Sequence, residues 1–325
     1  MGAAGAAAGV EVDGVAGGEH YDVVVIGGGP AGLSVGLNLV RARRRVLILD
    51  SNRPRHSATL VSHGFITRDG VSPLELRALG REEFAGYPTA EFHQGLVGSL
   101  RRDAETGVFS ISSRGVRGSA DREVSASVVV LASGLAETLP ALPSIRAYYG
   151  TSLHSCIECD GFEKGDEPLA LIGSTPDLAE RAVLVSQVSD DLIVFTGGAH
   201  VVTEAEEAAL AARGVVVERR ELSDVVGDRS GLTGVVLADG TTIARSGGFV
   251  RPLWSVPLPF AQTLESELER DPDGYVVVDS RGATSVEGLF AAGDITPPGP
   301  QQLIVAAGAG ARVAAAVNRH LLGPL

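Results

Sequence analysis

A glycine-rich turn between an apolar segment and a helix-like segment constrains the fold of this chain more than any other feature of its sequence. Residues 21–32 read Tyr-Asp-Val-Val-Val-Ile-Gly-Gly-Gly-Pro-Ala-Gly, which places Gly27, Gly29 and Gly32 in the spacing Gly-x-Gly-x-x-Gly. Between a strand and a helix, the first glycine permits a tight turn, the second lets a pyrophosphate approach the backbone, and the third lets the helix pack on the strand. An ordinary glycine turn is the alternative, but this context favours dinucleotide binding.

The residues after the turn complete a βαβ unit. Pro30 and Ala31 would open the helix, whose first N–H groups are free to attract an anion. Asp50 ends the next apolar segment, residues 46–50, and stands 18 positions beyond Gly32. A carboxylate at that distance is expected to accept hydrogen bonds from ribose hydroxyls.

A second strand, turn, helix and strand follow with the same pattern. Strands are expected at residues 169–172, 192–195 and 276–278, a hairpin around Asp239-Gly240, a helix ending near Ser189, and a final helix from about Gln302. The pattern predicts an α/β fold of two Rossmann-like three-layer nucleotide-binding domains, with the second inserted in the first. The expected boundaries are a disordered tail at 1–20, a first domain at 21–140 and 252–325, and a second domain at 141–251.

The length and charge of the chain exclude several classes of protein. A chain of 325 residues is long enough for two domains. Its 27 basic and 40 acidic side chains leave a net charge of −13, which disfavours nucleic acid as a partner. The apolar runs are shorter than the ~20 residues of a membrane-spanning helix, and residues 1–20 lack the features of a secretory signal. The sequence therefore predicts a cytoplasmic protein that binds neither nucleic acid nor membrane.

The chain has only two cysteines, Cys156 and Cys159. Two cysteines are too few for a disulfide scaffold or a structural zinc site, and the seven histidines show no ligand spacing, so no metal site is expected. The Cys-x-x-Cys spacing lets both sulfurs meet at the start of a helix, where the dipole favours the thiolate that disulfide exchange needs. A pair of inert buried thiols, or half of a shared metal site, is the alternative.

Two neighbours of the cysteines carry ionisable side chains. Asp160 follows the second cysteine directly and is placed to donate or accept a proton. His154 stands two residues before the first cysteine, where it either tunes that thiol or faces solvent. A further candidate is Gly293-Asp294, because it follows an apolar strand and precedes a helix of small residues that allows close approach to a flat ligand.

Taken together, these motifs resemble the low-molecular-weight thioredoxin reductase family over nearly all of residues 21–323. The resemblance is carried by the first glycine turn, by Ala132-Ser133-Gly134 in place of the family's Ala-Thr-Gly, by Cys-x-x-Cys-Asp-Gly-Phe at 156–162, and by Gly-Leu-Phe-Ala-Ala-Gly-Asp at 288–294. It implies a homodimer and FAD bound by the first and last segments, with Asp294 near the ribitol and pyrophosphate. The domain at 141–251 would then be of the NADPH-binding type.

The resemblance also implies the roles of individual residues. Cys159 would lie nearer the flavin, Cys156 would exchange with substrate sulfur, and Asp160 would serve as acid and base. The residues expected to bind the cofactor are Gly27, Gly29, Pro30, Ala31, Gly32, Asp50, Ser133, Gly134, Gly293, Asp294, Gln302 and Leu303.

The second turn departs from the family pattern. Thr175 and Leu178 place side chains where close backbone approach and tight helix packing need glycine or alanine. No arginine follows the next strand to hold a ribose phosphate, and an apolar stretch containing Trp254 replaces the family's Gly-x-x-Pro-Asn segment. The sequence therefore predicts that the nicotinamide site is lost or badly weakened. A working NADPH loop of unusual sequence is the alternative.

A branch of the family has the same departure and runs the reaction backwards: the oxidases of gliotoxin-like and holomycin-like natural products pass electrons from substrate dithiols to oxygen. The present chain is similar to that branch in its second turn and in Thr-Arg-Asp-Gly at 67–70 after His-Gly-Phe at 63–65, but it has Asp160 where the branch commonly has histidine. The leading hypothesis is an FAD-dependent dithiol oxidase with a small-molecule substrate. The alternatives are a disulfide reductase driven by NADPH or another electron carrier, and a flavin-binding redox sensor without turnover.

Overall fold

The computed structural model describes residues 19–297 and 299–324. Most of the expected disordered tail, residues 1–18, lies outside the described residues. The expected end of that tail is wrong by two residues, because strand β1 (Glu19–Ile26) already begins at Glu19. Glu19 and His20 pair in parallel with Val124 and Ser125 of a neighbouring strand, and this pairing extends the strand toward its amino end.

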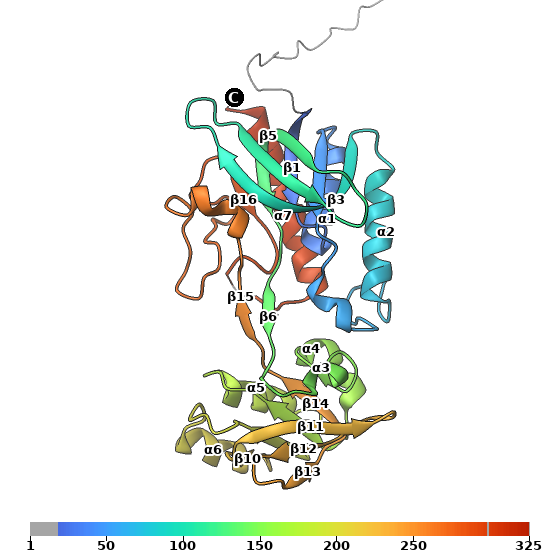
Figure 1. Cartoon of the computed structure of the whole chain (residues 1–325), viewed down its shortest axis with the longest axis vertical. Coiled ribbons are helices and arrows are strands. Elements are labelled where there is room, and N and C mark those ends of the chain that lie inside the picture. Colours follow the sequence, from blue (N-terminus) through green and yellow to red (C-terminus); the bar gives the residue numbers. More distant parts are fainter. Residues whose placement is uncertain (1–18, 298, 325) are drawn as a thin grey trace, which may run out of the picture.

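Strand β1 lies in the centre of the first sheet (Figure 1), with parallel neighbours on both sides. The other members are β2 (Val46–Asp50), β3 (Ala90–Arg102), β4 (Phe109–Gly115), β5 (Arg122–Leu131) and β16 (Leu289–Ala291). The strands β3, β4 and β5 pair in antiparallel fashion beyond the parallel part of the sheet. Helices α1 (Pro30–Arg41), α2 (Pro73–Ala85) and α7 (Leu303–Leu322) supply the helical layer.

The parallel strands of this sheet are buried on both faces, so their side chains divide between two hydrophobic cores. Val23 and Val25 of β1 pack with α1 and α7, whereas Val24 and Ile26 face the antiparallel strands and η3 (Pro259–Leu264). This alternation explains why the strands read as continuous apolar runs. It also produces the three layers that the sequence predicted.

The second sheet has the parallel order β10-β9-β8-β14-β7. Helices α5 and α6 cover one face and a three-stranded antiparallel sheet covers the other. The strands and helices are β7 (Leu153–His154), β8 (Leu169–Ile172), α5 (Leu178–Val185), β9 (Leu192–Phe195), α6 (Glu204–Ala211), β10 (Val216–Glu218), β11 (Leu222–Asp228), β12 (Gly231–Leu237), β13 (Thr242–Ala244) and β14 (Gly247–Val250). The predicted α/β fold of two Rossmann-like layered units is confirmed.

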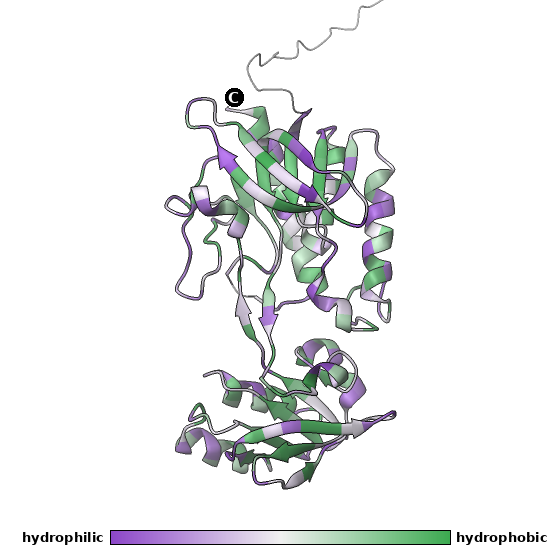
Figure 2. Ribbon diagram, in the orientation of Figure 1, coloured by the Kyte–Doolittle hydropathy of each residue, from purple (hydrophilic) through white to green (hydrophobic). Residues whose placement is uncertain are grey.

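Two antiparallel chain crossings join the two lobes of Figure 1. They are β6 (Ala136–Thr138) and β15 (Leu253–Ser255), which pair with each other. The short helices α3 (Ile145–Tyr148) and α4 (Ile157–Asp160) lie on the side of the lower lobe that faces the upper lobe, close to these crossings. Apolar residues concentrate in the central strands of both lobes (Figure 2), so each lobe has its own core.

Several local predictions can be compared with the structure. The hairpin around Asp239-Gly240 is confirmed, with Val235 opposite Ile243, and the final helix begins at Leu303 as expected. The strand expected at 276–278 is wrong, since the segment makes only an isolated bridge between Arg270 and Val276. Among the described residues, no helix combines the length and the apolar character that crossing a membrane requires.

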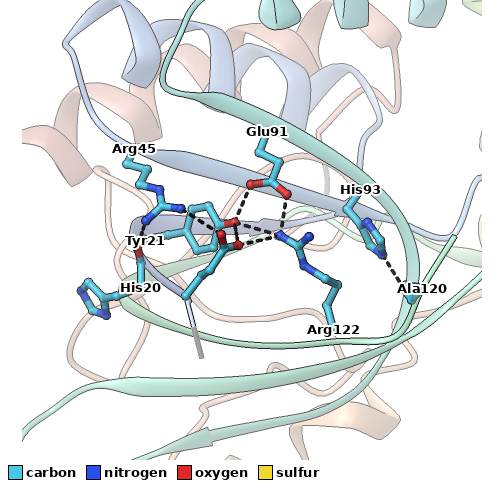
Figure 3. Close-up of polar contacts among 8 residues, drawn as sticks. His20, Tyr21, Arg45, Glu91, His93, Ala120 and Arg122 are labelled. Carbon is cyan, nitrogen blue, oxygen red and sulfur yellow. Dashed lines mark hydrogen bonds and ion pairs between the residues drawn. The ribbon is translucent and has the colours of Figure 1, made fainter. Parts of the chain in front are cut away.

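A polar cluster closes the amino end of β1, opposite the glycine turn (Figure 3). Tyr21 is fully buried, and its hydroxyl donates to Glu91 and contacts Glu19 and Arg122. Burial and the two carboxylates raise the pKa of Tyr21, so the phenol stays protonated. Arg45 lies over the ring, with its guanidinium carbon 4.4 Å from the ring centre. The cluster therefore satisfies the hydrogen bonds of a buried phenol, and none of its residues lines the cavities described below.

Candidate active site

The first glycine turn forms a bare backbone cradle at the carboxyl end of β1. Gly27 has φ 114°, and a side chain there would meet the carbonyl of Ala132. A side chain on Gly32 would meet the carbonyl of Gly27, so helix α1 packs directly on the turn. Gly29 caps that helix with nothing within 4 Å of its open side. The arrangement therefore leaves helix N–H groups and free space where a pyrophosphate would bind.

A cavity of about 260 Å³ opens above this turn. It is lined by thirteen of the fifteen predicted site residues, which are Gly27, Gly29, Pro30, Ala31, Asp50, Ser133, Gly134, Cys156, Cys159, Asp160, Asp294, Gln302 and Leu303. Gly32 and Gly293 stand outside the lining, because Gly32 packs on Gly27 and Gly293 packs on Ala31. The structure thus brings the expected nucleotide contacts and the cysteines to one cavity.

The Asp50 carboxylate already has hydrogen-bond partners within the protein, which the sequence did not predict. The carboxylate accepts hydrogen bonds from the Asn52 amide at 3.1 Å and from the Arg77 guanidinium at 2.5 Å. Arg77 is only 2% exposed and also donates to the Gly28 carbonyl, so it connects the acidic residue to the glycine turn. Sequence reasoning missed Arg77, although a charged residue on the inward side of a helix was a readable signal.

Asp294 is paired across the cavity with Arg55, with Oδ2 and Nη2 2.8 Å apart. The Arg55 guanidinium in turn lies over the Trp254 ring, 4.9 Å from its centre. Next to it, burial and the nearby Arg77 and Arg55 lower the pKa of His56 to about 4, so this imidazole is neutral at physiological pH. The buried Nε2 of His56 has no hydrogen-bond partner among the residues that the structure describes. Arg55 and His56 were not predicted as site residues from the sequence.

Cys156 and Cys159 form a disulfide at the start of α4, with Cys156 at the N-cap position and their Cα atoms 5.3 Å apart. Both sulfur-bearing residues are partly exposed and line the cavity above the first turn. Glu158 lies within α4, with its Oε2 3.6 Å from the Cys156 sulfur. The pair is therefore placed for exchange with a group bound on either side of it.

His154 is buried, so the option that it faces solvent is wrong. Its Nδ1 lies 2.9 Å from Oδ1 of Asp160, and its Nε2 lies 2.8 Å from the carbonyl oxygen of Thr151. The side chains of His154 and Asp160 are 10% and 14% exposed. The carboxyl that follows the second cysteine thus has a fixed imidazole partner.

The second turn is occupied by side chains where the first turn is bare. Asp177 caps helix α5, and its carboxylate accepts from the Thr175 hydroxyl at 2.6 Å and pairs with Arg251 at 2.7 Å. Leu178 follows and is fully buried in the helix packing. Burial alone would raise the pKa of Asp177, but hydrogen bonds from Arg251 and Thr175 lower it below its ordinary value. An ionised carboxylate therefore lies at the N-cap position of α5, beside the second turn.

A second cavity of about 400 Å³ lies between this turn and the chain crossing at β15. Cys156 lines it as well, so this residue borders both cavities. Its walls combine aromatic and charged side chains, among them Trp254, Tyr275 and Arg181.

The family model described as pyridine nucleotide-disulphide oxidoreductase matches residues 21–310, which include both glycine turns and the cysteine pair. This chain belongs to that family. Among solved structures, HlmI is similar with 37% identity and a TM-score of 0.85, covering 93% of each chain. An oxidoreductase from Agrobacterium tumefaciens is similar with 32% identity and a TM-score of 0.84, covering 94% of this chain and all of the other. A probable thioredoxin reductase of Arthroderma benhamiae is 33% identical over 185 residues, which are 55% of this chain and 45% of that relative.

Family membership settles the coarse chemistry of the site. The protein is an oxidoreductase that acts on sulfur groups, of the thioredoxin reductase type, and the family implies a flavin, FAD, as cofactor. The residues present fit such a group, because the first turn offers a cradle that any side chain would fill and the cavity above it reaches the disulfide.

Proposed function

We propose that this protein is an FAD-dependent dithiol oxidase, which closes a disulfide in a small-molecule natural product and uses oxygen as the electron acceptor. The observation that carries the proposal is the second turn, where the ion pair of Asp177 and Arg251 lies at the start of α5, the end of a helix that a dinucleotide's phosphates need. Electrons must then enter from the substrate thiols, since the usual donor has no bare cradle to bind.

The two turns differ in the features that a dinucleotide needs. A dinucleotide needs free helix N–H groups and close backbone approach. The first turn supplies both, with open space at Gly29. At the second turn the Asp177 carboxylate repels a pyrophosphate, and a hydrogen bond from Arg251 holds it in place. This difference between the turns supports the proposal that the nicotinamide site is lost or badly weakened.

Each residue has a role in this proposal. The turn at 27–32 would hold the pyrophosphate, Asp50 the ribose, and Asp294 the ribitol side, with the carboxyl ends of the strands framing the ligand. When bound, FAD would accept two electrons from the reduced cysteine pair and pass them on to oxygen. Cys156 receives the substrate sulfur, Cys159 faces the first cavity, and Asp160 holds or releases a proton beside it.

The second cavity is the proposed binding site of the dithiol. It reaches Cys156, and its aromatic wall at Trp254 and Tyr275 suits an apolar ring system. Its volume of about 400 Å³ suits a small molecule better than a folded protein partner. The apolar stretch that replaces the family's Gly-x-x-Pro-Asn segment thereby acquires a function.

Oxygen uptake tests the proposal directly. Purified flavoprotein is mixed with a small dithiol in air, without any nicotinamide, and oxygen consumption and peroxide are recorded together. The expected result is one peroxide for each disulfide formed, and loss of both signals in Cys156→Ser. Absence of oxygen uptake by a protein that contains flavin and an intact cysteine pair would overturn the proposal.

A second candidate function is a disulfide reductase driven by NADPH or by another electron carrier. The Cys-x-x-Cys-Asp sequence favours it, because Asp160 is the residue found in reductases, and the Arthroderma benhamiae relative bears a reductase name. Turnover of thioredoxin or another disulfide protein with an added reductant would support this candidate. A homodimer in the cytoplasm remains the prediction for either function.

A further inference from the structure

A buried arginine of helix α2 is joined to the first glycine turn and its surroundings by three hydrogen bonds. Nε of Arg77 donates to the Gly28 carbonyl oxygen at 3.3 Å, and Nη1 donates to the Asn52 side-chain oxygen at 3.2 Å. Nη2 donates to Oδ2 of Asp50 at 2.5 Å. Arginine is almost never fully buried unless its charge is paired, and here the pairing connects the turn, the end of β2 and the loop after it.

The inward face of α2 determines where this guanidinium lies. Arg77, Gly80 and Phe84 stand at positions i, i+3 and i+7, which share one face of a helix. Phe84 is fully buried in the core that α1 and α7 form with the first sheet. A side chain on Gly80 would lie 3.2 Å from Leu33 of α1, so the two helices are closely packed at this point. The packing of α2 therefore holds Arg77 over the turn.

The Asp50 carboxylate is held at both oxygens and still has room for a ligand. Oδ1 accepts from the Asn52 amide at 3.1 Å, and Oδ2 accepts from Arg77. A carboxylate has about four acceptor positions, so two of them are left. Asp50 and Arg77 both line the cavity above the first turn. The pairing thus sets the direction of the carboxylate without using all of its acceptor positions.

We infer that Arg77 is a positioning residue, which holds the Asp50 carboxylate in the direction in which it accepts a hydrogen bond from the adenosine ribose of FAD. The inference rests on the ribose role that the proposed function gives to Asp50, and it is independent of the electron acceptor. Without the guanidinium, the nearly buried carboxylate loses its paired charge and keeps one hydrogen bond, so its direction is no longer fixed. If Arg77 only joined α2 to the turn, its loss would lower stability and leave ribose recognition unchanged.

The test compares the affinity of the protein for FAD and for an FAD analogue that carries 2′-deoxyadenosine. The flavin is removed from the full chain, and the dissociation constant of each flavin is measured by equilibrium dialysis. The wild type should bind FAD roughly 10-fold to 100-fold tighter than the analogue, the range of one hydrogen bond to a charged group. In Arg77→Met this ratio should fall toward one. The ratio cancels a general loss of stability, because such a loss affects both flavins equally.

Two further variants of α2 make the comparison specific. Arg81→Met is the matched control, since Arg81 lies over the Phe92 ring and donates to the backbone carbonyl of Arg77. Among the described residues Arg81 makes no hydrogen bond to Asp50, so the control should keep the wild-type ratio. Arg77→Lys decides the question if the methionine variant does not fold. A single amino group does not reproduce the planar fork of a guanidinium, so its ratio should also lie below that of the wild type.

Asp50→Asn separates this inference from the role of Asp50 itself. It should lower the ratio, because a neutral amide binds the ribose hydroxyl more weakly than a carboxylate does. A wild-type ratio close to one, or an unchanged ratio in Asp50→Asn, would remove the ribose role of Asp50 and the inference with it. A lowered ratio in Asp50→Asn, together with an unchanged ratio in the Arg77 variants, would overturn the inference alone. Oxygen uptake, which tests the proposed function, is measured separately from all of these outcomes.

Discussion

At the scale of single residues, the site combines a glycine turn without side chains and carboxylates that are paired with basic side chains. Glycines keep the first turn free of side chains, while Asp50, Asp294 and Asp160 each have a fixed basic partner. Such pairing fixes the direction of each carboxylate before a ligand arrives. Cys156 lines both cavities, so it is the cysteine that a substrate in the second cavity would meet.

The order of attack on the cysteines gives the first prediction. Cys156 lines both cavities, whereas Cys159 lines only the one above the first turn. In Cys159→Ser the free Cys156 thiolate should therefore attack an added small disulfide, keep one half of it as a mixed disulfide and release the other half as a thiol. Intact-protein mass spectrometry detects the retained half as a stoichiometric adduct that is lost on reduction. Cys156→Ser is the matched control and should form little or no adduct. A stronger adduct on Cys159 in that control would reverse the assigned roles.

His56 gives a prediction about stability and pH. Its pKa is lowered to about 4 in the folded protein, against about 6.5 in an unfolded chain, so the unfolded state binds more protons between these values. Stability should accordingly fall as the pH drops from 6.5 to 4, by at most about 3 kcal/mol from this residue. Chemical unfolding of the flavoprotein at pH 7 and pH 4.5 measures the loss, and His56→Gln should show a smaller one. Equal losses in both proteins would contradict the assigned burial of a neutral imidazole.

At the scale of elements, the chain contains two βαβ units that differ at the start of the helix. Helix α1 begins with a glycine cap and open space, and helix α5 begins with an ionised cap held by Arg251. The small residues of helix α7 were expected to allow close approach to a flat ligand. Gly310 contacts the backbone of α1 at Ala31, and Gly308 has nothing within 4 Å. Neither of them lines the cavity above the first turn.

These two glycines of α7 form a matched pair for measuring helix packing. Gly308→Ala should raise the free energy of unfolding by up to about 1 kcal/mol, because alanine favours the helix and meets open space. Gly310→Ala should lower it by about 1 to 3 kcal/mol, because its methyl group would overlap the Ala31 carbonyl. Thermal unfolding of both variants tests the difference. Equal melting temperatures for the two would contradict the close packing of α1 on α7.

At the scale of the whole molecule, sequence patterns predict the fold well and the site in part. Parallel strands buried on both faces leave apolar runs, and glycine turns leave a fixed spacing, so both are readable. The partners Arg55 and Arg251 could not be read, since each reaches its carboxylate from a distant segment. Arg77 left only the signal of a charged residue on the inward side of α2, which does not name Asp50 as its partner. The strand expected at 276–278 was wrong because Val276 and the partly buried Val278 pack against the first core without joining a ladder.

One lobe has the bare first turn and the other has the second turn with its Asp177–Arg251 ion pair. The central claim is that electrons enter through substrate thiols and not through a nicotinamide nucleotide. An anaerobic titration of the flavoprotein tests this claim most directly, with flavin absorbance followed during stoichiometric additions of NADPH and, in a parallel cuvette, of a dithiol. The proposed function predicts that the dithiol bleaches the flavin while NADPH leaves it oxidised. Bleaching by stoichiometric NADPH would contradict it and would identify the second turn, with Asp177 and Arg251 in place, as a working nicotinamide site.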